Sequence, residues 1–189
     1  MTKPSTLLKA TLLASLVLLG TKAWAASNTP AHGELRTIAA LDLPRYLGTW
    51  YEIAKFPNRF QRKCTGFTKA TYTALPDGRV GVENACRVAD GSTDATTGVA
   101  RQIGGPTSPQ LKVRFAPPIF SFIPLVWGDY WVIDLDSNYT LAAVSEPGRE
   151  YLWILSRTPQ VEKGAYDALV ARLAAQGLDV GKLELTRQQ

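Results

Sequence analysis

The chain has 189 residues, of which 46% are hydrophobic and 20% are charged, a composition typical of a soluble globular protein. Its formal charge is +5, but residues 1–25 carry three lysines and no acidic residue, so the rest of the chain carries only +2. A charge this small, without a stripe of Lys and Arg, argues against nucleic-acid binding.

Residues 1–25 have the features of a secretory signal peptide. Lys3 and Lys9 provide a positive start, residues 10–20 an apolar stretch, and Ala23-Trp24-Ala25 a cleavage site. The apolar stretch is too short to cross a bilayer of about 30 Å as a helix. No Cys follows it to accept lipid, so we expect a periplasmic or secreted protein without a lipid anchor. Residues 26–40 are small and polar and predict a flexible tether, which leaves 41–189 as the folded domain.

Cys64 and Cys86 are the only cysteines of the chain. An isolated pair in an exported protein normally forms a disulfide, which here should contribute about 3 kcal/mol by restricting the unfolded chain. A reactive thiol would call for a nearby His or a Cys-x-x-Cys spacing, and the sequence offers neither.

Eight strands follow one another along the domain after a helical turn over 42–47, which has Pro44 near its start. The first strand runs from Gly48 to about Phe56. Strands over 67–75 and 79–88 flank the turn Pro76-Asp77-Gly78. Apolar residues then alternate with polar ones over 111–115, the pattern of a half-buried strand. The remaining strands are expected over 93–103, 129–134, 139–145 and 151–156.

One long helix follows the eighth strand. Thr158 is a candidate N-cap, Pro159 suits the first helical position, and Gly177 lies just past the end. One stripe of this helix contains Glu162, Tyr166, Leu169, Val170 and Leu173, and the apolar face of the helix must pack on the strands. A short closing strand is expected over 182–186. This order predicts an all-β fold: an eight-stranded antiparallel up-and-down barrel, with the C-terminal helix packed on it and room for one small ligand inside.

Trp50 and Arg157 are predicted to join the first strand to the last. A Gly before a Trp lets the chain turn tightly and lays the indole on the barrel floor. The guanidinium of Arg157 can then stack on the indole, worth about 0.5–2 kcal/mol. We interpret this pair as structural.

Three motifs, in order, resemble the signatures of the lipocalin family. They are Gly48-Thr49-Trp50-Tyr51, the segment 130–136 with Tyr139 after it, and Leu155-Ser156-Arg157-Thr158-Pro159. The match covers about residues 41–187 and is closest to the bacterial lipocalins, relatives of apolipoprotein D. The best-known bacterial relatives carry an acylated N-terminal Cys, which this chain lacks. The resemblance implies a calyx that carries lipid and no catalysis.

The strand pattern predicts that six residues line the inner wall of the barrel. At such positions an apolar side chain can equally fill the core or contact a ligand, because both bury apolar surface. The six residues are Tyr72, Val82, Val113, Phe115, Tyr130 and Trp153.

Two loops should open at the mouth of such a barrel, one after the first strand and one after the fifth. The first is basic, and the second, 117–127, is unusually apolar. Either the basic residues are simply solvated and the apolar loop plugs the mouth, or together they form a lip that contacts a membrane. The lip residues are Arg59, Arg62, Lys63, Phe120, Phe122 and Trp127.

The sequence thus favours a non-enzymatic carrier of a fatty acid or lysophospholipid, periplasmic and active in outer-membrane maintenance, with no cofactor or metal, as a monomer or weak homodimer. Two alternatives stay open: a binder of a retinoid or bilin, and an enzyme on the same barrel. The only His, His32, lies in the tether, which excludes His-based catalysis in the barrel. Three possible acids show no paired spacing: Glu52, Glu83 and Asp134.

Overall fold

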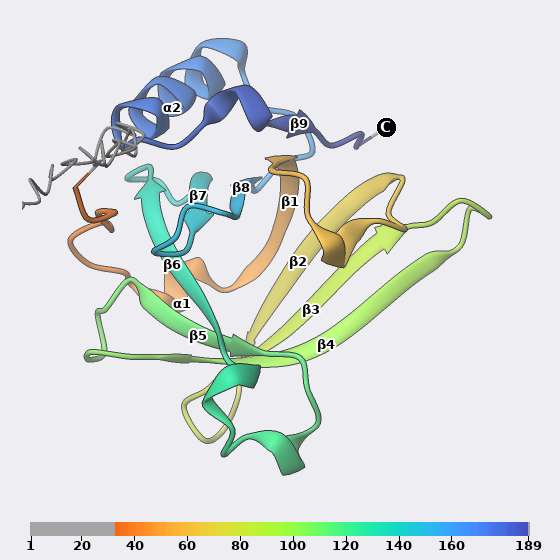
Figure 1. Cartoon of the computed structure of the whole chain (residues 1–189), viewed down its shortest axis with the longest axis vertical. Coiled ribbons are helices and arrows are strands. Elements are labelled where there is room, and N and C mark those ends of the chain that lie inside the picture. The colour runs from red at the N-terminus through yellow and green to blue at the C-terminus, as the bar shows by residue number, and fades with distance from the viewer. Residues whose placement is uncertain (1–32, 189) are drawn as a thin grey trace, which may run out of the picture. The chain divides into compact units, whose positions relative to one another are not determined.

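The computed structural model describes residues 33–188; the expected signal peptide, residues 26–32 of the expected tether and Gln189 lie outside this range. Figure 1 shows a sheet that curves around on itself, with one longer helix beside it. The helices are α1 (Leu43–Tyr46) and α2 (Lys163–Ala175). The strands are β1 (Gly48–Lys55), β2 (Gly66–Ala74), β3 (Val80–Arg87), β4 (Thr93–Gln102), β5 (Gln110–Arg114), β6 (Gly128–Leu135), β7 (Leu141–Ser145), β8 (Leu152–Ser156) and β9 (Glu184–Leu185).

The first eight strands form a closed antiparallel barrel, as the sequence predicts. Each strand pairs with the next, and β1 closes the ring because it pairs with both β2 and β8. In the register, Trp50 lies opposite Ala70 and Tyr51 opposite Ser156. The simple hairpin order puts alternate connections at opposite ends of the barrel. The connections after β1, β3, β5 and β7 therefore share one end, and α1 covers the other.

Two hydrophobic cores lie on the two sides of the sheet. The inner core is inside the barrel and includes Trp50, Tyr72 and Val132. The outer core lies between the barrel and α2, where Leu169 and Leu173 pack with Ile154 and other residues of β7 and β8. Strand alternation produces this division, because successive side chains point to opposite faces.

Helix α2 begins later than the sequence predicts. Its N-cap is Glu162, whose carboxylate accepts the backbone N–H groups of Gly164 and Ala165. The hydroxyl of Thr158, the expected cap, instead donates to the carbonyl of Gln160. The first free N–H groups of a helix need an acceptor, and the longer Glu side chain supplies it here. Among residues 33–188, no helix is long and apolar enough to span a membrane.

Both ends of the described chain pack against the barrel. Residues 33–40 form no helix or strand, but Leu35 is buried in the outer core, and the N–H of Ile38 donates to the carbonyl of Val132. At the other end, β9 pairs with β1 where β2 has diverged from it. The amide of Gln188 then donates to the carbonyls of both Glu52 and Thr68, so the tail fills the seam between β1 and β2.

Candidate ligand-binding calyx

The floor of the barrel is closed by the predicted pair of Trp50 and Arg157. Trp50 has no exposed surface, and its indole N–H donates to the carbonyl of Tyr46 at 2.7 Å. The guanidinium carbon of Arg157 lies 4.0 Å from the indole centre. The same guanidinium donates to the carbonyls of Thr49, Arg45 and Tyr139, so it joins three segments of the closed end.

Gly48 makes this contact possible in two ways. Its φ of +93° lies in the left-handed region, which side chains rarely adopt. A Cβ at this position would also lie 3.3 Å from Nη1 of Arg157. The Gly-x-Trp motif is therefore explained by the closure of the floor.

The inner face of β3 is buried next to the floor and exposed further along the strand. Val80 and Val82 of β3 are buried in the inner core, whereas Asn84 on the same face is exposed. Its partner across the strand pair, Thr96 of β4, is also exposed. Inner residues of a filled barrel would all be buried. The inner face is therefore exposed to solvent at Asn84 and Thr96, and this part of the barrel is the candidate calyx.

Three tyrosine hydroxyls meet between the floor and the open part. The hydroxyl of Tyr130 lies 2.8 Å from that of Tyr46 and 2.9 Å from that of Tyr72. Each phenol has one hydrogen to donate, so the three supply three hydrogens for two hydrogen bonds. In every arrangement one phenol hydrogen is left over. This cluster can therefore donate one hydrogen bond to a water molecule or to an oxygen of a ligand.

The tyrosine cluster stays uncharged at neutral pH. Burial raises the pKa of Tyr72 to about 12, and it also raises the pKa values of Tyr46 and Tyr130 well above their ordinary value. The cluster therefore offers a neutral hydrogen-bond donor.

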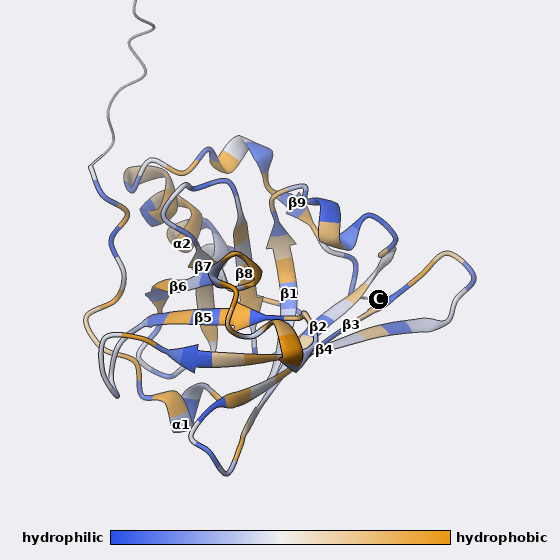
Figure 2. Ribbon diagram, turned by 60° about the horizontal axis from the view of Figure 1, so that its bottom comes forward, coloured by the Kyte–Doolittle hydropathy of each residue, from blue (hydrophilic) through white to orange (hydrophobic). Residues whose placement is uncertain are grey.

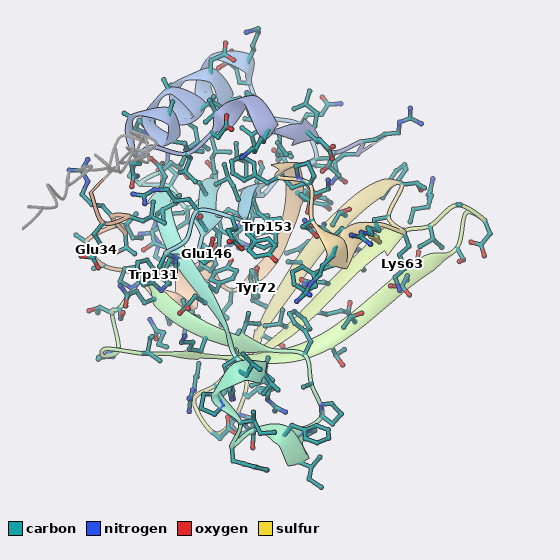
Figure 3. The ribbon with its side chains drawn as sticks, in the orientation of Figure 1. Glu34, Lys63, Tyr72, Trp131, Glu146 and Trp153 are labelled. Atoms are coloured by element: carbon teal, nitrogen blue, oxygen red, sulfur yellow. A yellow bond between two sulfur atoms is a disulfide. The ribbon has the colours of Figure 1, made fainter. Side chains whose placement is uncertain are left out.

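All six residues predicted for the inner wall lie on the inner face. Tyr72 and Val82 are buried, whereas Val113, Tyr130 and Trp153 are partly buried and pack against the inner core. In Figure 3 the side chains of Tyr72 and Trp153 lie within the ring of strands. Phe115 follows the end of β5 and is 41% exposed. Its ring lies over Gly98, where an added Cβ would be 2.7 Å from Cδ1.

A lid formed by residues 57–65 crosses the open end, and Gln61 anchors it. The side-chain carbonyl of Gln61 accepts from the indole N–H of Trp153 at 3.1 Å, and its amide donates to Glu52. On the far side, Cys64 is linked to Cys86 of β3, as the sequence predicts. Lys63 forms an ion pair of 2.8 Å with Asp94 of β4, and Figure 3 shows it beside these strands. The lid is therefore attached to β1, β8, β3 and β4.

Glu52 is a buried carboxylate below the lid. It accepts hydrogen bonds from the amide of Gln61 and from the hydroxyl of Thr186 in the C-terminal tail. Burial raises the pKa of Glu52 above its ordinary value, and these two hydrogen bonds offset part of that rise. The side chain of Glu52 thus links the lid to the C-terminal tail, and its buried environment disfavours the charged form of its carboxyl group.

The apolar loop between β5 and β6 does not plug the calyx. Phe120, Phe122 and Leu125 are 44%, 78% and 94% exposed. Figure 2 colours much of this segment as hydrophobic. Phe60 of the lid and Ile119 are exposed as well. The open end thus carries exposed apolar side chains from both loops that the sequence placed at the mouth.

The three basic residues of the lid have different surroundings. Lys63 is in the ion pair with Asp94, Arg59 lies over the ring of Phe60 at 5.1 Å, and Arg62 is exposed. Trp127 of the apolar loop is partly buried and donates its indole N–H to the carbonyl of Ser121.

The acidic candidates lie in three separate environments. Glu52 is under the lid, Glu83 is exposed on β3, and Asp134 forms a two-point ion pair with Arg172 of α2. No carboxylate pair forms among them. Within residues 33–188, no group of three or more His, Cys, Asp or Glu residues is placed to hold a metal ion, and His32 lies outside that range.

The family model described as a lipocalin-like domain matches residues 41–188. The protein belongs to the lipocalin family. Temperature-induced lipocalin-1 of Arabidopsis thaliana is 44% identical to this lipocalin over 158 residues, 82% of this chain and 83% of the relative. Outer membrane lipoprotein Blc of Escherichia coli K12 is 40% identical over 163 residues, 86% of this chain and 87% of the relative. Apolipoprotein D of Macaca fascicularis is 30% identical over 155 residues, 78% and 77% of the two chains.

Solved structures support the fold. Insecticyanin from the tobacco hornworm Manduca sexta superposes with a TM-score of 0.63 at 18% identity, covering 81% of this lipocalin and 84% of the insecticyanin chain. Apocrustacyanin C1 gives a TM-score of 0.60 at 15% identity, covering 78% and 80% of the two chains. At these identities the likeness concerns the barrel alone.

The sequence analysis does not identify several residues of the calyx and of the surface beneath the apolar loop. Tyr46 follows from the position of α1 under the floor, which no local pattern reveals. Gln61 is a polar residue in a polar loop, and only the folded path of the lid gives it partners. Arg101 and Arg114 surround Trp127 of the apolar loop. Alternation along β4 and β5 could have placed both arginines on the outer face, but it could not have placed the loop there.

Proposed function

We propose that this lipocalin is a non-enzymatic periplasmic carrier, which holds a fatty acid or a lysophospholipid in the calyx and serves outer-membrane maintenance. The observation that carries the proposal is the inner face of the barrel, which is buried at the floor and exposed to solvent at Asn84 and Thr96. The family relationship supports it, and a relative at 40% identity bears the name outer membrane lipoprotein.

The ligand lies with its acyl chain toward the floor and its polar head under the lid. Tyr72, Val82, Val113, Phe115, Tyr130 and Trp153 form the wall. Each buried CH₂ contributes about 0.8 kcal/mol, so a long chain gains of the order of 10 kcal/mol before the entropic cost of binding is subtracted. Selectivity for chain length is modest, because an apolar wall distinguishes one methylene by only about 1–3 kcal/mol.

Native mass spectrometry of the protein purified from its host tests the ligand. We expect an adduct with the mass of a fatty acid or lysophospholipid, and no visible absorbance. A coloured preparation would instead indicate a retinoid or bilin, and turnover of the bound lipid into a product would indicate an enzyme. Either result would contradict the proposed carrier.

Docking at a membrane surface is the second part of the proposal. Phe120 and Phe122 enter the acyl boundary of the bilayer, while Arg59, Arg62 and Lys63 face the headgroups. Trp127, the third predicted apolar residue of the lip, is partly buried and fixes the base of the loop instead. The exposed apolar side chains of the loop support this lip, since a contiguous apolar surface normally marks an interaction site. Lys63 takes part less than the two arginines, because it is already paired with Asp94.

Vesicle co-sedimentation tests the lip. We expect the Phe120→Ser, Phe122→Ser double variant to bind anionic vesicles more weakly at every salt concentration, because apolar burial is insensitive to salt. Replacing Arg59, Arg62 and Lys63 by Gln should weaken binding mainly at low salt, where the Debye length exceeds about 8 Å. If neither variant differs from the parent, the docking proposal is wrong and only the calyx remains.

A further inference from the structure

The apolar loop rests on the outer face of β4 and β5, where three basic side chains gather. Ala100, Leu111 and Val113 of these strands belong to the inner core or pack against it. Their neighbours Arg101, Lys112 and Arg114 therefore point outward by alternation. Trp127 lies over this outer face, with its ring centre 4.5 Å from the guanidinium carbon of Arg101 and 5.2 Å from that of Arg114.

The positive charge under the loop is not balanced by the protein. Arg114 is only 3% exposed, and its Nε is buried without a hydrogen-bond partner. Nη1 donates to the neutral carbonyl of Ala116. Among the ion pairs of residues 33–188, none includes Arg101 or Arg114, and the nearby Asp129 is paired with Lys112.

A buried cation normally has an anionic partner, because desolvation of the charge costs several kcal/mol. Contact with an indole returns only about 0.5–2 kcal/mol. The stack on Trp127 therefore does not compensate Arg114, which has no anionic partner among residues 33–188.

A hollow beneath the same loop offers a place for an anion beside Arg101 and Lys112. It has a volume of about 160 Å³ and is lined by Arg101, Lys112, Ser121, Phe122, Pro124 and Trp127. By the same measure one water molecule needs about 10–15 Å³, so the hollow has room for a group larger than several water molecules, such as a phosphate. A guanidinium, an ammonium and a hydroxyl are the groups that bind phosphate oxygens.

We propose that this hollow binds the phosphate of an anionic phospholipid while the lipid remains in the bilayer. The proposal rests on the proposed docking of the loop, because Phe122 both lines the hollow and is 78% exposed. With Leu125, also exposed, in the acyl boundary, the hollow lies at headgroup depth. The cations that contact the headgroup are thus Arg101 and Lys112, which line the hollow, in addition to those of the lid.

Arg101→Gln tests the phosphate site, because the side chain of Arg101 is exposed and its loss leaves the barrel intact. Arg87→Gln is the matched control: Arg87 is an exposed arginine of β3 that stacks on Phe67 at 3.8 Å, away from the hollow. Each variant removes one positive charge and one aromatic stack. Binding is measured to vesicles of phosphatidylcholine alone and of phosphatidylcholine mixed equally with phosphatidylglycerol.

We expect Arg101→Gln to bind the mixed vesicles at least fivefold more weakly than the parent, since one arginine near an anionic surface contributes about 1 kcal/mol. Arg87→Gln should lose clearly less, Arg101→Lys should recover most of the binding, and binding to phosphatidylcholine alone should not change. Equal losses in Arg101→Gln and Arg87→Gln would overturn the site, because they would reveal only diffuse attraction.

The Phe120→Ser, Phe122→Ser variant separates the two proposals. If it binds the mixed vesicles weakly while Arg101→Gln binds them like the parent, the loop docks and the phosphate site is wrong. If the serine variant binds the mixed vesicles as tightly as the parent, the proposed docking is wrong. The phosphate site is then wrong as well, because it rests on the docking of the loop. The calyx and its ligand are untouched by either result.

Discussion

Replacing Trp50 by Ala should strongly destabilise the barrel without changing its affinity for ligand. The indole is completely buried, lies tilted against the ring of Tyr46 with 4.8 Å between ring centres, and donates to the Tyr46 carbonyl. The guanidinium carbon of Arg157 lies 4.0 Å from the centre of the indole. The substitution therefore removes a large buried side chain, one hydrogen bond and one cation–π contact at the closed end.

The expected loss is about 3–5 kcal/mol, the range for large buried aromatics. A domain of this size loses about 2–4 °C of melting temperature per kcal/mol, so the midpoint should fall by about 6–20 °C. Trp50→Phe keeps most of the ring and loses the N–H donor, and should cost about 1–2 kcal/mol. Arg157→Ala should cost less than Trp50→Ala, because Arg157 is partly exposed and leaves carbonyls that water can reach.

Urea unfolding followed by circular dichroism measures these losses, and titration with a fluorescent fatty acid measures ligand affinity at a temperature where every variant is folded. We expect the order of stability parent, Trp50→Phe, Arg157→Ala, Trp50→Ala, with one common affinity. If Trp50→Ala and Arg157→Ala unfolded like the parent but lost the ligand, the pair would be functional and the structural reasoning would be refuted.

Two further predictions concern the lid. Peptide mapping without reduction should find Cys64 linked to Cys86, and replacing both by Ser should lower the free energy of unfolding by about 3 kcal/mol; a variant as stable as the parent would contradict this. Because burial raises the pKa of Glu52 from 4.5, the native state holds this proton more tightly than the unfolded chain, and stability should fall as pH rises from 4.5 through the raised pKa. Glu52→Gln should flatten this part of the stability profile in urea unfolding, and an unchanged slope would show that Glu52 is not its source.

The barrel could be predicted from the sequence because its determinants are local and repeated. Alternation along each strand assigns a face to every residue, and hairpin turns such as Pro76-Asp77-Gly78 fix the order of the strands. The floor could be predicted for a different reason. A Gly before a Trp of this size at the start of a strand leaves few other roles for the motif, and the positive φ of Gly48 in the structure agrees with it. The disulfide followed from the compartment and the absence of any other Cys.

The start of α2 shows where local signals mislead. Thr158 and Pro159 form a valid start signal, and Glu162 reads equally well as part of a helical stripe. The structure uses Glu162 as the cap, so the segment before it stays outside the helix. Two acceptable caps four residues apart cannot be ranked from the sequence, because the choice depends on where the helix must lie to bury Leu169 and Leu173 against the barrel.

The mouth was the least predictable part, because its side chains acquire partners only through loop paths. The sequence allows two arrangements of the apolar loop: it folds inward and plugs the mouth, or it forms a lip that contacts a membrane. The local pattern does not distinguish between them. In the structure the loop does not plug the mouth, because residues of other strands hold it elsewhere. Trp127 packs on the outward-pointing Arg101 and Arg114, which fixes the base of the loop on the outer face of the barrel. With Trp127 held there, Phe122 and Leu125 are left exposed. The same contact that keeps the calyx open thus creates the exposed apolar surface from which membrane docking is proposed.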